Sequence, residues 1–288
     1  MQLLLYTVLL LGLLSLVGAL VLYGTAKRFH VDEDPRIDAI ASQLAGANCG
    51  GCGFKGCRDF ATACVKAGKL DGLFCPVSGT DGMKRIAGIL GVSVSGDTKR
   101  RIAVLRCNGT CEARPKRYDY DGAMSCRVMS AVAVGTRGCA YGCLGCGDCV
   151  EVCRFGALSI DHITGLPVID TARCTACGAC VAECPRSLLE LRPEGRRMPN
   201  GTQRRVWVAC ANRDKGGVAR KTCAVACIGC GKCARECAFG AINIADNLSY
   251  INPDMCKICG KCVRECPTGA ILASFKLPQI SSPTNTPC

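Results

Sequence analysis

Four copies of one cysteine pattern, CxxCxxCxxxC, constrain this chain more than any other feature of its sequence. The copies begin at Cys143, Cys174, Cys227 and Cys256, so a pair of runs recurs after about 83 residues. Cysteine makes up 28 of the 288 residues, whereas histidine makes up only two. This balance favours thiolate-ligated metal sites in a reducing compartment over a disulfide scaffold, and it argues against a histidine-based zinc hydrolase or a haem array.

Each pair of runs predicts a ferredoxin-like unit that holds two crossed 4Fe-4S clusters. In such a run, the first three cysteines bind one cluster and the fourth reaches across to the other. We place the units at residues 139–190 and 223–274. Four zinc sites with this spacing are a much weaker alternative. The predicted ligand sets are Cys143, Cys146, Cys149 and Cys184; Cys174, Cys177, Cys180 and Cys153; Cys227, Cys230, Cys233 and Cys266; and Cys256, Cys259, Cys262 and Cys237.

Short strands are expected between the two cysteine runs of each unit. In the first unit, residues 157–160 and 168–170 flank a turn at Gly165, and in the second, residues 241–244 and 249–252 flank Asp246 and Asn247. Two positions depart from the usual pattern, in which proline follows the fourth cysteine: Arg154 and Ala238 occupy them. We expect these changes to loosen a loop or alter cluster solvation without removing a ligand.

A fifth cluster is predicted in a separate small domain at residues 33–92. Asp34 and Pro35 read as a helix start, with apolar residues at helical spacing until Gly46. The predicted ligands are Cys49, Cys52, Cys57 and Cys75, and a zinc site on the same thiolates is the alternative. Cys64, on a further helix, reads as a buried thiol that is not a ligand. The glycines of this stretch also spell GxGxxG, but no apolar strand precedes them, so dinucleotide binding is not predicted.

The N-terminal residues 1–26 read as a membrane anchor. Leu3 to Tyr23 are 21 residues without a charge, which is long enough for one transmembrane helix. No basic region precedes this stretch, and Lys27 and Arg28 follow it, so a cleaved signal peptide is disfavoured and the rest of the chain is placed in the cytoplasm.

Eight cysteines remain outside the five predicted clusters, and several lie in the connecting segments 93–138 and 191–222. The segments share a leader, since Cys107 precedes Cys139 before the first unit and Cys210 precedes Cys223 before the second. The leader cysteines are either packed thiols or part of a sixth site. The sixth site that the sequence allows consists of Cys107, Cys111, Cys126 and Cys139, and Cys288 in the tail 275–288 reads as a free thiol.

The formal net charge of +13 raises the question of an acidic partner. The basic residues come in short groups, which suits either solvated loops or a docking surface for an acidic protein. A zinc protein that binds nucleic acid is disfavoured by the anchor and by the ferredoxin-like spacing. We therefore predict no nucleic-acid partner.

The layout resembles the B-subunit of the Rnf complex, a membrane ferredoxin:NAD oxidoreductase that moves sodium ions or protons. The resemblance covers nearly the whole chain and rests on the N-terminal span, on NCGGCGFKGC with Cys75 and Pro76, and on RCNGTC, GCAYGCLGCGDC and VACIGCGKC. It implies an electron-transfer subunit of a translocase, in the bacterial cell membrane with its clusters on the cytoplasmic side. It also implies that reduced ferredoxin donates the electrons and that other membrane subunits accept them.

Taken together, these patterns predict an α+β chain with one transmembrane helix, a small 4Fe-4S domain and two ferredoxin-like units. Five clusters are expected, and a sixth is allowed. No acid, base or nucleophile constellation is evident, so substrate turnover is not expected of the isolated chain. The competing hypothesis is an iron–sulfur reductase, in which an incompletely ligated cluster among residues 107–139 binds a substrate.

Overall fold

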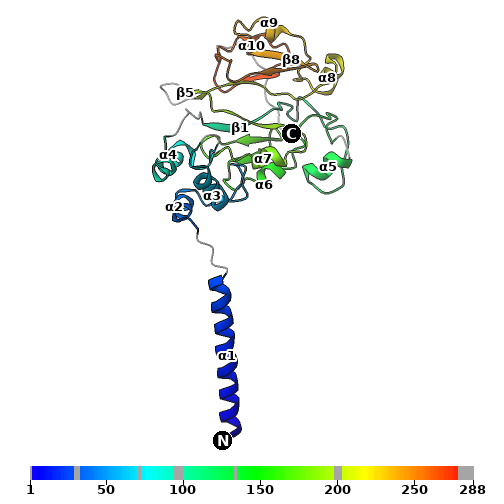
Figure 1. Cartoon of the computed structure of the whole chain (residues 1–288). Helices are drawn as coiled ribbons and strands as arrows, with labels where there is room; N and C mark the ends of the chain where they lie inside the picture. Colours follow the sequence, from blue (N-terminus) through cyan, green and yellow to red (C-terminus); the bar gives the residue numbers. More distant parts are fainter. Residues whose placement is uncertain are drawn as a thin grey trace.

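The computed structural model describes residues 2–28, 33–70, 73–93, 100–132, 135–197 and 203–277. Figure 1 shows three parts in chain order: a long N-terminal helix, a middle body that holds the small helical domain and the first unit, and the second unit at the opposite end. The helices are α1 (Gln2–Arg28), α2 (Pro35–Gln43), α3 (Cys57–Ala67), α4 (Gly79–Leu90), α5 (Cys126–Val132), α6 (Asp148–Glu151), α7 (Ala179–Glu183), α8 (Gly216–Thr222), α9 (Lys232–Arg235) and α10 (Lys261–Glu265).

The described strands form pairs, and every pair is antiparallel. They are β1 (Arg101–Leu105) with β4 (Leu189–Pro193), β2 (Leu158–Asp161) with β3 (Leu166–Ile169), β5 (Arg196–Arg197) with β6 (Gln203–Arg204), β7 (Val206–Val208) with β10 (Ile271–Ala273), and β8 (Ile242–Ala245) with β9 (Leu248–Ile251).

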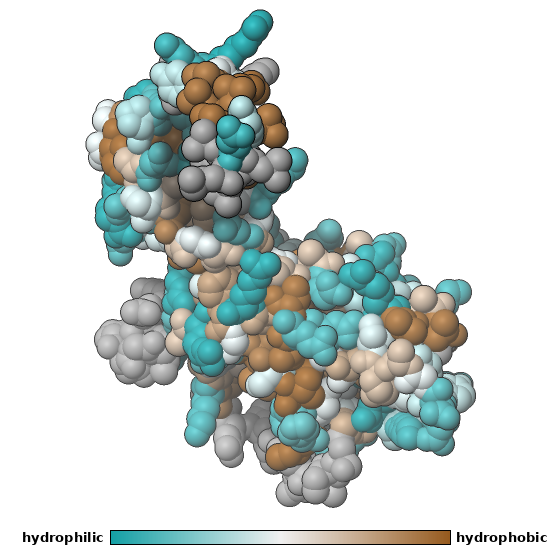
Figure 2. Space-filling model, turned by 90° about the horizontal axis from the view of Figure 1, so that it is seen from below, coloured by the Kyte–Doolittle hydropathy of each residue, from teal (hydrophilic) through white to brown (hydrophobic). Residues whose placement is uncertain are grey.

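Helix α1 carries apolar side chains all around its surface. Tyr6 and the Leu, Val and Tyr side chains from Leu9 to Tyr23 are more than half exposed, and Lys27 and Arg28 lie in the last turn. Within the described residues, no helix combines the length and apolarity that a membrane crossing requires, so the predicted transmembrane helix is not confirmed. Figure 2, a view from below, shows hydrophobic and hydrophilic side chains interspersed over the visible face of the molecule.

The small domain of residues 33–92 is built from α2, α3 and α4. Asp34 caps α2 as predicted, since its side chain accepts a hydrogen bond from the backbone N–H of Arg36. The helix ends at Gln43, three residues before Gly46, where we expected its end. Phe60 and Cys64 of α3 are fully buried with Ile40 and Ile86, so the predicted burial of Cys64 on a helix is confirmed.

The two units share one plan. Each contains a hairpin between its cysteine runs, β2–β3 or β8–β9, and the bounds agree with the predicted strands to within two residues. Asp246 and Asn247 both adopt positive φ in the β8–β9 turn, which asparagine and aspartate tolerate better than most residues. Each unit also has an outer pair, β1–β4 or β7–β10, which joins its leader to the residues after its last cysteine. The sequence patterns did not predict these outer pairs.

The units pack against each other through the outer pairs. Trp207 of β7 donates from Nε1 to the carbonyl of Leu105 in β1, at 3.0 Å. Arg192 of β4 is buried, forms an ion pair with Glu190 at 2.6 Å, and donates to the carbonyls of Val206 and Ile251 in the second unit. A strand of one unit thereby satisfies backbone acceptors of the other, which fixes how the cysteine loops of the two units approach.

Candidate functional site

The second unit brings its cysteines together in two groups. Cys227, Cys230, Cys233 and Cys266 line one cavity of about 300 Å³, and Cys237, Cys256, Cys259 and Cys262 line another of about 340 Å³. In both groups, the fourth cysteine of one run joins the first three of the other run. The Ser249 hydroxyl lies 3.3 Å from Cys233 Sγ at the first cavity. Cys230 and Cys259 are exposed, so both cavities lie close to the protein surface.

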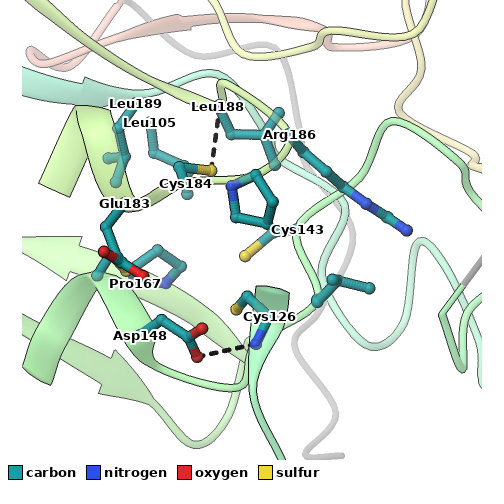
Figure 3. A pocket seen from close by; sticks show the side chains of 13 residues that line it. Leu105, Cys126, Cys143, Asp148, Pro167, Glu183, Cys184, Arg186, Leu188 and Leu189 are labelled. Atoms are coloured by element: carbon teal, nitrogen blue, oxygen red, sulfur yellow. Dashed lines mark hydrogen bonds between the residues drawn. The ribbon is translucent and has the colours of Figure 1, made fainter. Parts of the chain in front are cut away.

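The first unit follows the same plan, except that Cys146 is not among the residues that line its cavity. Cys153, Cys174, Cys177 and Cys180 line a cavity of about 310 Å³, and Cys143, Cys149 and Cys184 line one of about 390 Å³. Figure 3 shows the side chains of Cys126 and Cys143 together at the second of these cavities, with Cys184 above them. Cys146 is near Cys126, and burial followed by the effect of Cys126 raises the pKa of Cys146 to about 12.

The N-terminal cysteines lie together in the small domain. Cys52, Cys57 and Cys75 pack in its hydrophobic core, and Cys49 and Cys75 are both close enough to raise the pKa of Cys52 after the larger effect of burial. Asn48 Oδ1 accepts a hydrogen bond from the Cys57 N–H at 2.8 Å, which holds the CxxCxxxxC loop against the start of α3. A Cβ at Gly51 would lie 2.5 Å from the carbonyl oxygen of Cys177, so this domain and the first unit touch at their cysteine loops.

Backbone N–H groups point at several of the cysteine sulfurs. Ala157 donates to Cys153, Leu188 to Cys184, Ala103 to Cys174 and Ile258 to Cys256, with N–Sγ distances of 3.3 to 3.4 Å. Hydrogen bonds to sulfur stabilise thiolates and help set the potential of a bound cluster.

Burial dominates the electrostatics of these thiols. It raises the pKa of Cys143, Cys180 and Cys262 to about 12, and neighbouring cysteines add to the effect. Metal binding must therefore displace protons from these groups, which couples cluster binding to folding.

The donor set fits iron–sulfur clusters. In the described part of the chain, no group of three or more Cys, His, Asp or Glu side chains is arranged to hold a metal ion. The cysteines instead surround cavities of similar size, and sulfur is the ligand that 4Fe-4S clusters use.

Family models of iron–sulfur domains match four stretches of the chain. The 4Fe-4S dicluster domain matches residues 142–189 and residues 226–270, and a third dicluster match over residues 173–241 spans the last run of one unit and the first run of the next. An Fe-S cluster model matches residues 44–77 of the small domain. The chain therefore carries multiple 4Fe-4S binding domains.

Relatives match over most of the chain. The B-subunit of the Na⁺-translocating ferredoxin:NAD⁺ oxidoreductase complex of Acetobacterium woodii is 41% identical over 86% of this chain and 71% of its own length. The B-subunit of the ion-translocating oxidoreductase complex of Methanosarcina acetivorans is 39% identical over 85% of this chain and 88% of its own length. The B-subunit of the proton-translocating ferredoxin:NAD⁺ oxidoreductase complex of Clostridium ljungdahlii is 36% identical over 85% of this chain and 82% of its own length. The chain belongs to the B-subunit family of Rnf complexes.

In this member of the Rnf family, the four cysteines of the sixth site that the sequence allowed do not line one cavity. Cys107 and Cys139 lie together, but Cys126 lines the cavity of Cys143, Cys149 and Cys184 instead. Cys111 lies elsewhere, with its sulfur 3.0 Å from Arg137 Nη2. The four cysteines were grouped only because they are neighbours in sequence, whereas α5 carries Cys126 away towards the first unit.

Sequence reasoning missed the structural roles of two residues near the cysteine groups of this Rnf subunit. Cys126 is an additional thiol beside a predicted ligand set, and no spacing rule connects it to the run that begins at Cys143. Arg154, which we identified only as a departure from proline, donates to the carbonyl of Ala47 at 2.9 Å and ties the first unit to the N-terminal domain.

Proposed function

We propose that this chain is the iron–sulfur electron-relay subunit of its complex, with five 4Fe-4S clusters on the cysteine sets named above. When bound, each cluster supplies one-electron storage and transfer, without proton chemistry. The observation that carries the proposal is the contact between successive cysteine groups. A Cβ at Gly51 would meet the backbone of Cys177, so the N-terminal group adjoins the first unit. Cys149 packs in one cluster with Cys180, and Cys233 packs in another with Cys262, so the two groups within each unit adjoin each other.

We place the electron donor, reduced ferredoxin, at the second unit. Its exposed cysteines, Cys230 and Cys259, are flanked by exposed basic side chains that an acidic protein recognises: Lys232 and Arg235 on α9, Lys257 before α10, and Lys261 and Arg264 on α10. Complementary charge would steer the donor to the place where two cysteine sets lie closest to solvent. Ferredoxin loses one electron in each encounter, and the chain gains it.

The direct test is anaerobic stopped-flow reduction of the full chain by reduced ferredoxin. We expect the visible absorbance of the clusters to bleach in a second-order reaction whose rate constant falls steeply with ionic strength. A chain with a full complement of iron and sulfide that ferredoxin does not reduce would overturn the proposal. NAD⁺ reduction by the chain alone would also contradict it, because the relay needs partner subunits to complete the reaction.

The membrane attachment proposed for this subunit rests on α1. Its exposed leucines and valines suit lipid or membrane-protein surroundings, and Lys27 and Arg28 at its end suit the cytoplasmic side of a bacterial cell membrane. Other membrane subunits of the complex would then receive the electrons near the N-terminal domain. Replacing Leu13 and Val17 with arginine should release the chain from membranes into the soluble fraction, whereas alkaline carbonate should not extract the wild type. Release of the wild type by salt alone would contradict an apolar attachment.

A further inference from the structure

A further cavity, between the two units, is lined by four cysteines that none of the five predicted ligand sets uses. Cys107, Cys139, Cys210 and Cys223 surround about 310 Å³, the same volume as the cavity of Cys153, Cys174, Cys177 and Cys180. All four side chains are buried, with exposed fractions of 6 to 8%. We call this the interunit cavity. Like each of the other cysteine-lined cavities in the described part of the chain, it is lined by four cysteines.

Each unit contributes two equivalent cysteines to the interunit cavity. Cys107 follows β1, and Cys210 follows β7, which are the leader strands of the two outer pairs. The first cysteine of the following run donates in the same way on both sides: Cys143 N–H to Cys107 Sγ at 3.4 Å, and Cys227 N–H to Cys210 Sγ at 3.3 Å. Cys139 and Cys223 each stand four residues before a CxxCxxCxxxC run. Packed thiols would not require this repeated geometry.

Polar groups inside the interunit cavity are arranged for an anion. Asn212 is 2% exposed and donates from its backbone to Cys210 Sγ at 3.4 Å and from Nδ2 towards Cys139 Sγ at 3.8 Å. Arg114 is 3% exposed and lines the cavity, and its Nε has no hydrogen-bond partner. Its other contacts are the carbonyls of Cys143 and Gly109. A buried guanidinium with an unpartnered donor needs a negative group nearby, and none of the described lining residues is Asp or Glu.

Glycines keep space open around the same arginine. A Cβ at Gly142 would lie 2.3 Å from Arg114 Nη1, and a Cβ at Gly109 would lie 3.1 Å from its Nε and 3.4 Å from Cys223 Sγ. These two positions therefore allow the guanidinium and the sulfurs to share one cavity.

We propose that the interunit cavity binds a sixth 4Fe-4S cluster through Cys107, Cys139, Cys210 and Cys223. Four thiolates complete the ligand set of such a cluster, which carries a net negative charge that Arg114 and the N–H donors would stabilise. Because all four positions are filled by cysteine, the site leaves no open coordination position for a substrate. This is where the reductase hypothesis would have needed one.

The inference rests on the proposed relay and completes its path. One hydrogen bond separates Cys107 from Cys143 of the first unit, and another separates Cys210 from Cys227 of the second. A one-electron centre here would accept an electron from one unit and release it to the other, with no proton or further reactant. The path would run from the second unit through the interunit cavity to the first unit and then to the N-terminal domain.

The test is the iron, acid-labile sulfide and zinc content of the full chain, prepared anaerobically, with Mössbauer spectra that count all iron. We expect about 24 irons in the wild type and about 20 in the paired variant Cys139→Ser/Cys223→Ser, because one cluster holds four. The variant Cys64→Ala is the control for loss of a buried thiol and should keep all its iron. The variant Cys111→Ser should also keep all its iron. If Cys107, Cys111, Cys126 and Cys139 were the ligands instead, this variant would lose four irons.

Two outcomes would overturn the sixth cluster. One is about 20 irons in both the wild type and the paired variant, and the other is one zinc per wild-type chain that the paired variant lacks. If the paired variant does not fold, Arg114→Gln keeps every ligand. This variant should retain about 24 irons, but the reduction potential of one cluster should fall, as measured by redox titration followed by paramagnetic resonance. Unchanged potentials for all clusters would contradict the assignment. Failure of the five-cluster relay itself is distinguishable, because wild-type iron would then fall far below 20.

Discussion

The two dicluster units share a backbone plan but differ in surface and exposure. Between its first and last predicted ligands, the first unit has two arginines against five Asp and Glu, whereas the second has five Lys and Arg against four Asp and Glu. Asp148 lies two residues after the second cysteine of the first run in the first unit, and Lys232 occupies the equivalent position in the second unit. Two cysteines of the second unit are exposed, whereas those of the first are buried or half-buried. One scaffold thus serves two environments.

The difference follows from what surrounds each unit. The first unit is covered by the N-terminal domain, through Ala47 and Gly51, and by α5, whose first N–H groups bond to Asp148. Lys232, in the matching position of the second unit, is exposed. The cysteine spacing is the same in both units, as the proposed clusters would require, whereas the residues between the cysteines differ. This division suits a chain with one end open to a soluble donor and the other embedded in the assembly.

Removal of iron should have the largest effect, and it should affect the two units in a defined order. Under anaerobic conditions, a strong chelator should strip the second unit first, because Cys230 and Cys259 are exposed. That unit should then lose its fold, since Cys227, Cys233 and Cys262 belong to its core. Hydrogen exchange of β8–β9 compared with β2–β3, followed against iron release, measures the order. Simultaneous loss of protection in both hairpins would show that exposure does not control cluster loss.

Breaking the contact between the two units should have the second-largest effect. Arg192→Leu removes the donors to Val206 and Ile251 and leaves Glu190 half-buried without its close partner, so we expect a loss of about 3 to 5 kcal/mol in the free energy of opening. Native-state hydrogen exchange of β7 and β9 measures it. Arg106→Leu is the control, because Arg106 is less buried and lies 3.8 Å from Glu190. Its expected cost is below about 1 kcal/mol. Equal effects would mean that Arg192 does not join the units.

The comparison also shows what the sequence could predict. The cysteine spacing predicted the two hairpins, and it predicted that the fourth cysteine of each run lies beside the other run of its unit, because both features depend on short-range geometry. It could not predict the interunit cavity. Cys107 and Cys223 are separated by more than a hundred residues, and they meet only because β1–β4 and β7–β10 pack together.

One sequence signal for that cavity was present but incomplete. The repeated leader places Cys107 with Cys139 and Cys210 with Cys223, and each pair supplies only two thiols. A cluster needs four, so two half-sites related by the repeat could have indicated a shared centre. Grouping by proximity in sequence led instead to Cys111 and Cys126. Likewise, Arg154 reads as a lost proline until its contact with Ala47 is seen.

Charge reversal on the second unit should slow its reduction by ferredoxin. Lys232→Glu/Lys261→Glu should lower the second-order rate constant about tenfold at low salt, and the difference should shrink at high salt. Lys66→Glu/Lys84→Glu makes the same change of charge on exposed helix positions of the N-terminal domain and should have little effect. If the control variant slows reduction as much as the test variant, then ferredoxin docks elsewhere or the rate constant depends only on the net charge of the chain.

The smallest effect should come from the matched positions Asp148 and Lys232. Asp148 accepts hydrogen bonds from Ser125 Oγ, Cys126 N and Arg127 N at 2.8, 2.8 and 3.2 Å, so it acts as a cap for α5 from outside the helix. Asp148→Ala should cost about 1 kcal/mol, seen as faster hydrogen exchange in α5, and Asp148→Asn should restore part of it. Lys232→Ala should leave the exchange of α9 unchanged, because that side chain is exposed. Equal responses would mean that the two positions have not diverged in role. A selective response of α5 would show that the repeat uses the same position for structure in one unit and leaves it free for docking in the other.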